Sequence, residues 1–137
     1  MTEPAIAWKV LNTDGTAYHG GQAQWPLPPD GRLGAWLEVT GPLVPCERGL
    51  HLCRRDDLVG WLGPAIYEAE YEGTAIDHGN KIVVGRARLR QKLETWNAHT
   101  ARLFAVWCAE QVVPIFEAFR PGDRRPRECL AVARRYA

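Results

Sequence analysis

The spacing of the apolar residues changes once along the 137-residue chain, close to residue 93. Before that point apolar and polar residues alternate in short segments, which is typical of half-buried β-strands. After it, apolar residues recur every three or four positions, which is typical of α-helices. The length suits one domain with a core that needs neither disulfide nor metal. We therefore expect a single α+β domain over residues 1–137, in which a small antiparallel or mixed β-sheet over residues 1–92 is packed by a buried helical hairpin over residues 93–137.

Two segments show the strand pattern most clearly. Ala5–Leu11 is a short apolar run that ends at a turn sequence over Asn12–Gly15, where glycine supplies the positive φ that such turns need. Ala65–Glu72 places alanines and tyrosines on one face. Its other face carries Ile66, Glu68, Glu70 and Glu72. We therefore expect an amphipathic strand whose acidic side faces solvent.

Shorter elements are expected around these two strands. Trp25–Gly34 is predicted to be a loop, because its prolines cannot donate the ladder hydrogen bonds of a central strand. Lys81–Arg90 predicts a further strand with three arginines on one side, Arg86, Arg88 and Arg90. Two short strands and one short helix complete the predicted elements of this part: Ala35–Thr40, Gly49–Cys53 and Asp57–Leu62.

The C-terminal part carries one long apolar stripe. Asn97 is a suitable N-cap for a helix that begins at Ala98. The stripe then recurs at helical spacing through Ala101, Phe104, Ala105, Cys108, Val112 and Ile115. Because further apolar residues widen it nearly all round, we expect a buried central helix that bends near Pro114. Asp123 is expected to cap a last helix.

The net charge of +1 hides an uneven distribution. Residues 1–80 carry five basic against eleven acidic residues, a charge of −6, and residues 81–137 carry twelve against five, a charge of +7. Such asymmetry favours either two parts that dock on each other or a basic part that meets an anionic partner. We do not expect nucleic acid as a partner, because few aromatic residues are interleaved with the arginines.

Hydropathy and cysteine content point to a soluble chain. No apolar run approaches the ~18 residues that a membrane-spanning helix needs, so we expect no membrane association. The N-terminus lacks the basic region and apolar core of a signal peptide, and we expect a cytoplasmic protein. Four cysteines in such a chain favour thiols over a disulfide framework.

One cluster has metal-ligand chemistry. Cys46, His51 and Cys53 lie close in sequence, and His51 and Cys53 are two apart on a predicted strand, so both face the same way. Structural zinc sites, however, usually contain a C-x2-C pair, which this chain lacks. We therefore expect no metal site and keep these three residues as weak zinc candidates.

Two further features allow either a structural or a binding role. The run from Asp123 to Arg127 contains Arg124, Arg125 and Arg127, which could pair with glutamates and lock two helices together, or could bind an anion or acidic protein. Trp25 and Trp36 flank the proline-rich loop. They could pack in the core or present aromatic anchors to a partner.

The C-terminal segment resembles a known family. It contains Asp123-Arg124-Arg125-Pro126-Arg127 and ends in Ala133-Arg134-Arg135-Tyr136. It looks like the helical segment of immunity proteins of bacteria and phages, in which an Asp-x-Arg-Pro-Arg run opens a helix that ends in Ala-Arg-x-aromatic. Cys129-Leu130 departs mildly from that pattern. The front, through Cys46-Glu47-Arg48-Gly49-Leu50-His51, resembles uncharacterised phage and bacterial proteins.

A weaker resemblance concerns the N-terminal part. Tyr18-His19-Gly20-Gly21, followed by Gly49-Leu50-His51-Leu52-Cys53, is similar to two motifs of the ADP-ribosyltransferase fold. In that family they hold the ribose and nicotinamide of NAD, and a glutamate opens a late strand. Here Lys81 stands at that position, where its charge would oppose a developing oxocarbenium ion. Under this resemblance the catalytic candidates are His19 and His51, with Glu68, Glu70 or Glu72 in place of the missing glutamate, Glu70 being the one we single out.

These observations lead to one main expectation and one alternative. We expect a small non-enzymatic protein without cofactor, a monomer or homodimer, that binds a protein partner as an inhibitor or immunity-type protein of a phage, mobile element or bacterial conflict system. Its expected contact surface combines the loop Trp25–Trp36 with Ala65–Glu72 or the arginine-rich helix. The alternative is a divergent or inactive ADP-ribosyltransferase-like protein that binds NAD.

Overall fold

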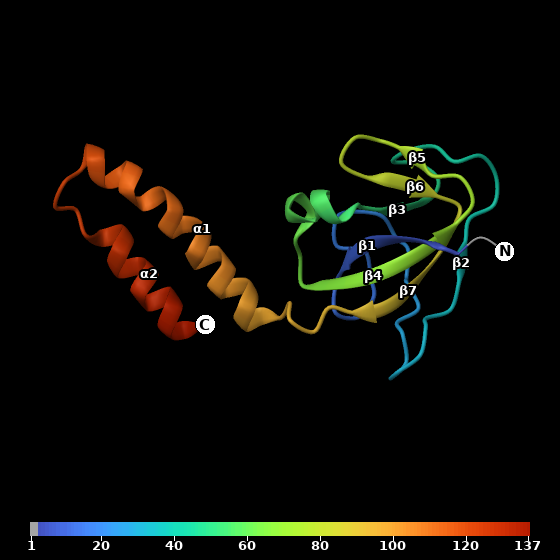
Figure 1. Ribbon diagram of the computed structural model, residues 1–137, viewed down its shortest axis with the longest axis horizontal. Helices are drawn as coiled ribbons and strands as arrows, with labels where there is room; N and C mark the ends of the chain where they lie inside the picture. Colours follow the sequence, from blue (N-terminus) through green and yellow to red (C-terminus); the bar gives the residue numbers. More distant parts are fainter. Residues whose placement is uncertain (1–2) are drawn as a thin grey trace. The chain divides into compact units, whose positions relative to one another are not determined.

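The computed structural model describes residues 3–137 and contains two compact units. The first extends to Leu93 and holds the strands, and the second runs from Glu94 to Ala137 and holds two helices (Figure 1). We call them the β unit and the helical unit. Antiparallel sheets in the N-terminal two-thirds and a helical pair at the C-terminus confirm the predicted α+β class. The boundary lies beside the change in apolar spacing, and the expectation of a single domain stays a prediction.

Two antiparallel sheets build the β unit. The larger has the strand order β1-β4-β7-β2, formed by Ala5–Leu11, Ala65–Glu72, Arg86–Lys92 and Leu37–Glu38. The smaller has the order β3-β6-β5, formed by Leu50–Leu52, Ile82–Val84 and Ile76–Asp77. Residues Arg55–Trp61 form a 3-10 helix, η1, after β3. The predicted strand Lys81–Arg90 is thus divided at Gly85 into β6 and β7, which belong to different sheets.

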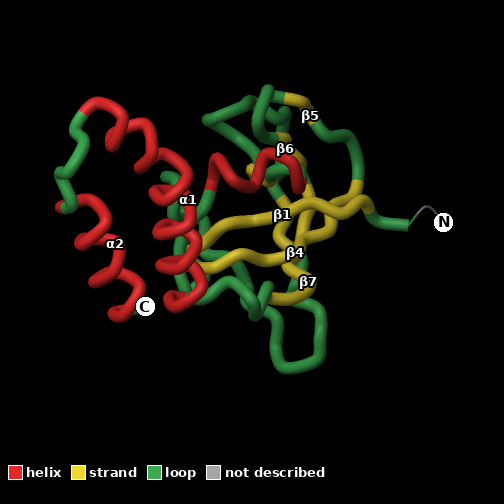
Figure 2. Tube along the Cα trace, turned by 60° about the vertical axis from the view of Figure 1, so that its left-hand side comes forward, coloured by secondary structure: helices red, strands yellow, loops and turns green. Residues whose placement is uncertain are grey.

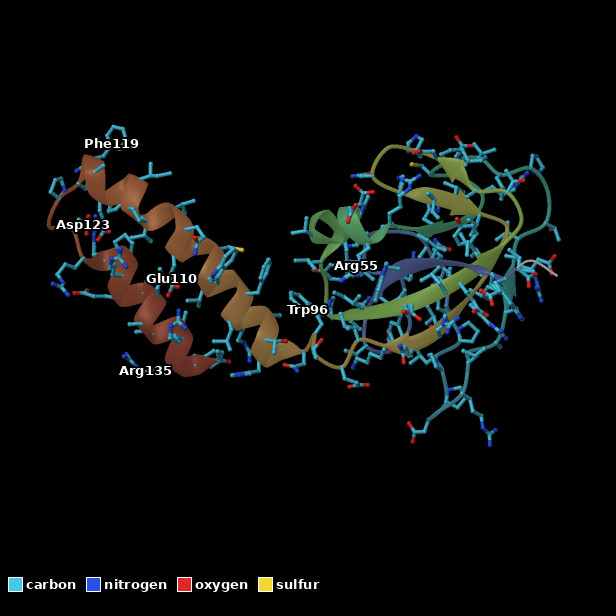
Figure 3. The ribbon with its side chains drawn as sticks, viewed as in Figure 1. Arg55, Trp96, Glu110, Phe119, Asp123 and Arg135 are labelled. Carbon is cyan, nitrogen blue, oxygen red and sulfur yellow. The ribbon has the colours of Figure 1, made fainter. Side chains whose placement is uncertain are left out.

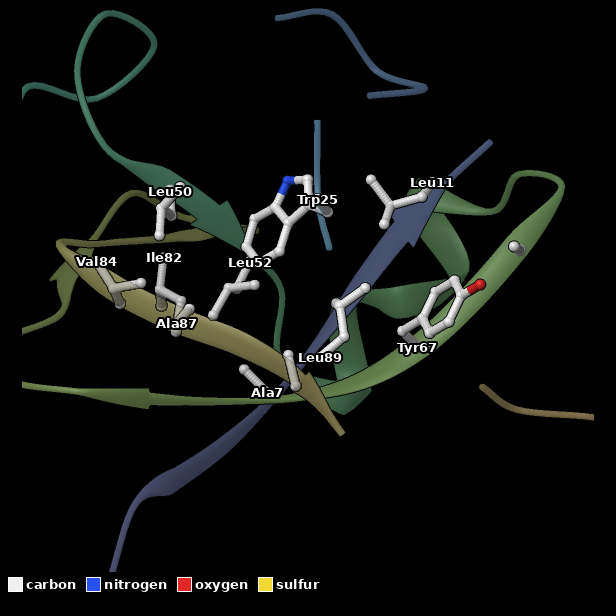
Figure 4. Packing of buried hydrophobic residues seen from close by; sticks show 12 residues of the cluster. Ala7, Leu11, Trp25, Leu50, Leu52, Tyr67, Ile82, Val84, Ala87 and Leu89 are labelled. Atoms are coloured by element: carbon white, nitrogen blue, oxygen red, sulfur yellow. The ribbon is translucent and has the colours of Figure 1, made fainter. Parts of the chain in front are cut away.

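The core of the β unit lies where residues of both sheets meet (Figure 4). Leu11, Leu89 and Val84 are completely buried. Trp25 joins them from the proline-rich loop, with its side chain only 2 % exposed (Figure 4). Of the two roles considered for Trp25, the structure shows the core one, and this indole is not available as an anchor for a partner.

The acidic face of β4 differs from the prediction. Glu70 is buried at 2 % exposure, because β7 lies beside β4 in a register that sets Arg88 opposite Glu70. Arg88 Nε lies 2.5 Å from Glu70 Oε1, and Arg90 Nη1 lies 2.8 Å from Glu70 Oε2. The expectation of a solvent-facing acidic strand is therefore wrong for Glu70. Alternation along one strand reports which side chains share a face, whereas the neighbouring strand decides whether that face is covered.

The helical unit is an antiparallel pair, α1 over Ala98–Phe119 and α2 over Arg125–Tyr136 (Figure 2). Asn97 caps α1 as predicted: its side chain accepts a hydrogen bond from the Thr100 backbone N–H, and the Thr100 hydroxyl accepts one from the Asn97 N–H. Asp123 accepts a hydrogen bond from the Arg125 N–H at the start of α2. The α1 helix continues through Pro114 to Phe119.

Burial of α1 also differs from the prediction. Only Val106 and Val113 of α1 are buried, and glutamates on the same side bond to arginines of α2. Arg127 forms two hydrogen bonds to Glu117, of 2.8 and 2.9 Å, and Arg134 pairs with Glu110. The apolar stripe predicted to be core is largely exposed instead. The face of α1 that contacts α2 is narrower than the apolar stripe of α1. The expectation that α1 is buried nearly all round is therefore wrong.

Candidate functional site

A pocket of about 470 Å³ opens in the β unit. Two loops and the β3 strand line it together with residues of β1. Its lining residues include Lys9, His19, Trp25, Cys46, His51, Cys53, Trp61 and Lys81. His19, His51 and Lys81, which the sequence separates by up to 62 positions, therefore converge on one pocket.

One wall is aromatic and fixed in place. The Trp61 indole N–H donates a hydrogen bond of 2.8 Å to the Asn80 carbonyl. His19 Nε2 bonds to the Trp61 carbonyl, and the two rings meet edge to face with centroids 5.2 Å apart. Because its N–H is already bonded, the Trp61 side chain can offer the pocket only its ring.

A second wall joins a thiol, an imidazole and an ammonium group. Lys81 Nζ donates to Cys46 Sγ over 3.0 Å, and the Cys46 N–H donates to His51 Nε2 over 2.9 Å. Cys46 holds this position with a positive φ of 65°. Burial lowers the pKa of His51, and the nearby charges of Lys81 and Lys9 lower it further. The imidazole that accepts the Cys46 N–H is therefore neutral.

The floor of the pocket contains a lysine that strand β1 carries inward. Lys9 Nζ donates a hydrogen bond of 2.8 Å to the His51 carbonyl and lies 5.3 Å from the centre of the Trp25 ring. Burial lowers the pKa of Lys9 to about 8 and raises the pKa of the neighbouring Cys53 to about 11. Desolvation disfavours the charged form of each group, which explains the opposite directions.

Gly49 lets the β3 strand reach this position. Its φ is 140°, and a Cβ there would stand 2.3 Å from Val83 Cγ1 on β6. A side chain at residue 49 would therefore push β3 away from β6 and displace His51 with it. The glycine of the sequence motif has a packing role in this structure.

The pocket is cationic. Among its lining residues Glu47 is the one acid. Within residues 3–137 neither Lys9 nor Lys81 forms an ion pair with a carboxylate: Lys9 donates to a carbonyl oxygen and Lys81 to a sulfur. Such a site can attract and hold an anion, whereas it lacks the paired carboxylates of acid–base chemistry.

The remaining candidates for catalysis or metal binding lie elsewhere or form no set. Glu70 is held by Arg88 and Arg90 and is not among the pocket residues. Cys46 and His51 meet in the pocket, but the Cys53 thiol donates to the Trp8 carbonyl over 3.6 Å. In the described part of the chain no three His, Cys, Asp or Glu side chains are placed to hold a metal ion.

The candidates for partner binding are largely engaged within their own units. Trp36 is half-buried, with the guanidinium carbons of Arg86 and Arg88 at 4.0 and 4.4 Å from its ring centre. Arg125 forms a two-pronged pair with Asp123, and Arg127 pairs with Glu117. Arg124 forms no ion pair within residues 3–137. The locking role considered for the arginine run is thus observed for Arg127, whose pair joins the two helices.

Two pocket residues were missed at the level of sequence. Lys9 interrupts the apolar run of Ala5–Leu11 with the one charged residue in that strand, and this interruption is a usable signal of a half-buried lysine. Trp61 carried no such signal, because its role depends on the meeting of η1 with the loop at His19.

Comparison with known proteins gives one match. Residues 91–137 match the family model described as "Imm-5 like putative immunity protein". The match covers about a third of the chain and contains the helical unit together with the last three residues of the β unit. No curated protein and no solved structure matches the chain, and the resemblance to ADP-ribosyltransferases gains no support. No helix among residues 3–137 is long and apolar enough to cross a membrane. The similarity to immunity proteins therefore belongs to the helical unit.

Proposed function

We propose that the chain is an immunity-type protein whose helical unit binds and inhibits a toxin protein. The observation that carries the proposal is the match of residues 91–137 to the immunity family model, because this range contains the whole helical unit. The proposal does not use the loop Trp25–Trp36, whose first indole is buried in the core.

The surface that best fits such a role is the outer face of α1. We define this outer face by its apolar residues at helical spacing: Phe104, Trp107, Cys108, Val112, Ile115 and Phe119. Val112 is 56 % exposed, Ile115 63 % and Phe119 82 %. Contiguous exposed apolar side chains on a helix are typical of a surface that a partner covers. Figure 3 shows Phe119 pointing away from α2.

The charge of the helical unit indicates which charged groups we expect on the toxin around the apolar groove that contacts α1. The unit contains seven arginines against five acids. Arg120 and Arg124, which follow the outer face at the end of α1, form no ion pair within residues 3–137. We therefore expect a toxin surface with an apolar groove and a rim of carboxylates.

The test uses one matched pair of variants. Val112 on the outer face and Val132 on α2 are the same residue type with the same exposure, 56 %. The full chain is co-expressed with each member of a panel of bacterial toxin domains, and growth and complex formation are measured. We expect one toxin to be neutralised by the wild type and by Val132→Asp and to escape Val112→Asp. Equal protection by both variants would contradict the surface, and failure to neutralise any toxin would contradict the function.

A further inference from the structure

We propose that the pocket of the β unit is a binding site for a small organic anion that carries a planar ring. Lys81 and Lys9 face the anionic group, and Trp61 packs against the ring. This site lies outside the residues that match the immunity family and does not depend on the function proposed for the helical unit.

The size and the lining of the pocket set the class of ligand. A volume of about 470 Å³ lies within the range of roughly 300–1,000 Å³ that small-molecule sites occupy. Trp8 and Trp61 are among the residues that line it. An inorganic anion would leave this aromatic surface unused, whereas a ring would cover it.

Two lysines, Lys9 and Lys81, provide positive charge for the anionic group of the ligand. Lys81 Nζ lies 5.8 Å from the centre of the Trp61 ring and is bonded to the Cys46 sulfur, a weak acceptor. Lys9 is bonded to the carbonyl of His51, and Cys46 is bonded to the imidazole of the same residue. Both lysines are thus connected to His51, whose pKa both of their charges lower. A carboxylate or phosphate would provide the counter-ion that the described protein atoms do not give them.

The lysine at residue 81 also excludes the opposite class of ligand. A cationic ligand would meet two ammonium groups and a single lining acid, Glu47. Like charges at such short range in a partly desolvated pocket disfavour binding. The anionic group of the ligand can be a phosphate, as in a nucleotide, or an aromatic carboxylate, and the experiment separates these two sources.

Calorimetry on the full chain tests the requirement for both parts of the ligand. The probes are AMP, which has ring and phosphate, salicylate, which has ring and carboxylate, adenosine, which has the ring alone, and inorganic phosphate. We expect AMP or salicylate to bind at least about tenfold more tightly than adenosine and phosphate, since one charge-assisted contact supplies that factor. Binding by AMP alone identifies a phosphate site, and binding by salicylate alone identifies a carboxylate site. Equal binding of AMP and adenosine, or no binding of any probe, overturns the proposal.

Cysteine labelling locates the bound probe. Cys46 is exposed at the pocket, whereas the exposed Cys108 and Cys129 belong to the helical unit and serve as internal controls. We expect the probe that binds to slow alkylation of Cys46 by iodoacetamide, read by mass spectrometry, without changing Cys108 or Cys129. Unchanged labelling of Cys46 at saturating probe would overturn the assignment to this pocket.

Substitutions then test the assigned roles. Lys81→Gln removes the charge, Lys81→Arg keeps it, and Lys92→Gln removes a charge from β7 outside the pocket. We expect Lys81→Gln to weaken binding at least about tenfold, Lys81→Arg to retain most of it, and Lys92→Gln to leave it unchanged. Equal affinity of Lys81→Gln and the wild type would overturn the role of Lys81. If Lys81→Gln fails to fold, the affinity of Trp61→Leu for the probe is measured instead. Weaker binding by Trp61→Leu supports binding in this pocket. Wild-type affinity of Trp61→Leu overturns the contact between Trp61 and the ring of the ligand.

Discussion

The β unit and the helical unit satisfy their side chains in different ways. In the β unit, strands from both sheets bury a continuous apolar cluster, and each glutamate of β4 forms an ion pair with an arginine of β7. In the helical unit only Val106 and Val113 are buried, and the wider apolar face of α1 is exposed. The β unit therefore contains its own core, whereas most apolar side chains of α1 are not buried by contact with α2.

The distribution of charge supports the same contrast. Counted by unit, the β unit has ten basic and eleven acidic residues, and the helical unit has seven and five. The large asymmetry about residue 80 therefore does not separate the two units. It arises because the arginines of β7 follow their glutamate partners along the chain, and the two sets neutralise each other across one sheet.

The largest expected difference in stability is between substitutions of one tryptophan in each unit. Trp25→Ala removes an indole that is 2 % exposed, and Trp107→Ala removes one that is 56 % exposed. Because a cavity forms only at the buried site, we expect Trp25→Ala to cost about 4 kcal/mol of unfolding free energy and Trp107→Ala under about 1 kcal/mol. Urea denaturation followed by circular dichroism measures both. Similar losses would contradict the contrast in packing.

The next effect tests the buried charge cluster. Glu70→Ala leaves the half-buried Arg88 without a carboxylate and leaves Arg90 with Glu68 alone. We expect a loss of about 3 kcal/mol of unfolding free energy. Glu72→Ala is the matched control, because Glu72 also pairs with an arginine of β7 but is 48 % exposed at its side chain. The control should lose within about 0.5 kcal/mol. If both variants lose the same free energy of unfolding in urea denaturation, burial of Glu70 does not make its ion pairs more stabilising than those of Glu72.

Local pattern predicted the elements of both units well. The segments Ala5–Leu11 and Ala65–Glu72 are strands β1 and β4 with the predicted ends, and Asn97 caps α1. These features depend on residues that are close in sequence: alternation, turn glycines and a capping side chain. The predicted strand over Lys81–Arg90 divides at Gly85, because its two halves pair with strands of different sheets.

Features that depend on distant residues were predicted less well. The burial of Glu70 requires the register between β4 and β7, and the exposure of Val112 depends on which face of α1 meets α2. Sequence singled out His19, His51 and Lys81 but could not show that they share a pocket, since η1 and two loops bring them together. A pattern along one element reports its own faces, and the partner of each face is a property of the whole fold.

A smaller effect tests the helical unit alone. Asn97→Ala removes the side chain that accepts the Thr100 N–H at the start of α1, and loss of such a cap costs about 1 kcal/mol. His99→Ala, an exposed change in the same first turn, is the control and should lose under about 0.5 kcal/mol. Thermal unfolding followed at 222 nm measures both. Equal stability of the two variants would show that the capping box does not hold α1.

The smallest effect is a pH dependence that belongs to the β unit. The pKa of Lys9 is lowered from 10.5 to about 8 in the folded chain, so above pH 8 the unfolded chain binds more protons at this residue than the folded one. The free energy of unfolding must then rise with pH above 8. Cys53 acts in the opposite sense, because its pKa is raised from 9.0 to about 11 and the unfolded chain releases its proton first. The contribution of Cys53 to the free energy of unfolding therefore falls as pH rises above 9.

Single substitutions separate these two opposing slopes. Between pH 8 and 9 Lys9 dominates, and we expect the wild type to gain under about 1 kcal/mol in urea denaturation. Lys9→Met should lose this gain, and Cys53→Ala should extend it above pH 9, because the opposing thiol is gone. Lys92→Met, a change on β7 outside the pocket, should behave as the wild type. The free energy of unfolding of the wild type could instead stay constant between pH 8 and 9, and that of Lys9→Met could show the same dependence on pH. This result would mean that Lys9 is solvated as in the unfolded chain. In that case the pocket would also lose the desolvated cation that distinguishes the β unit from the open face of α1.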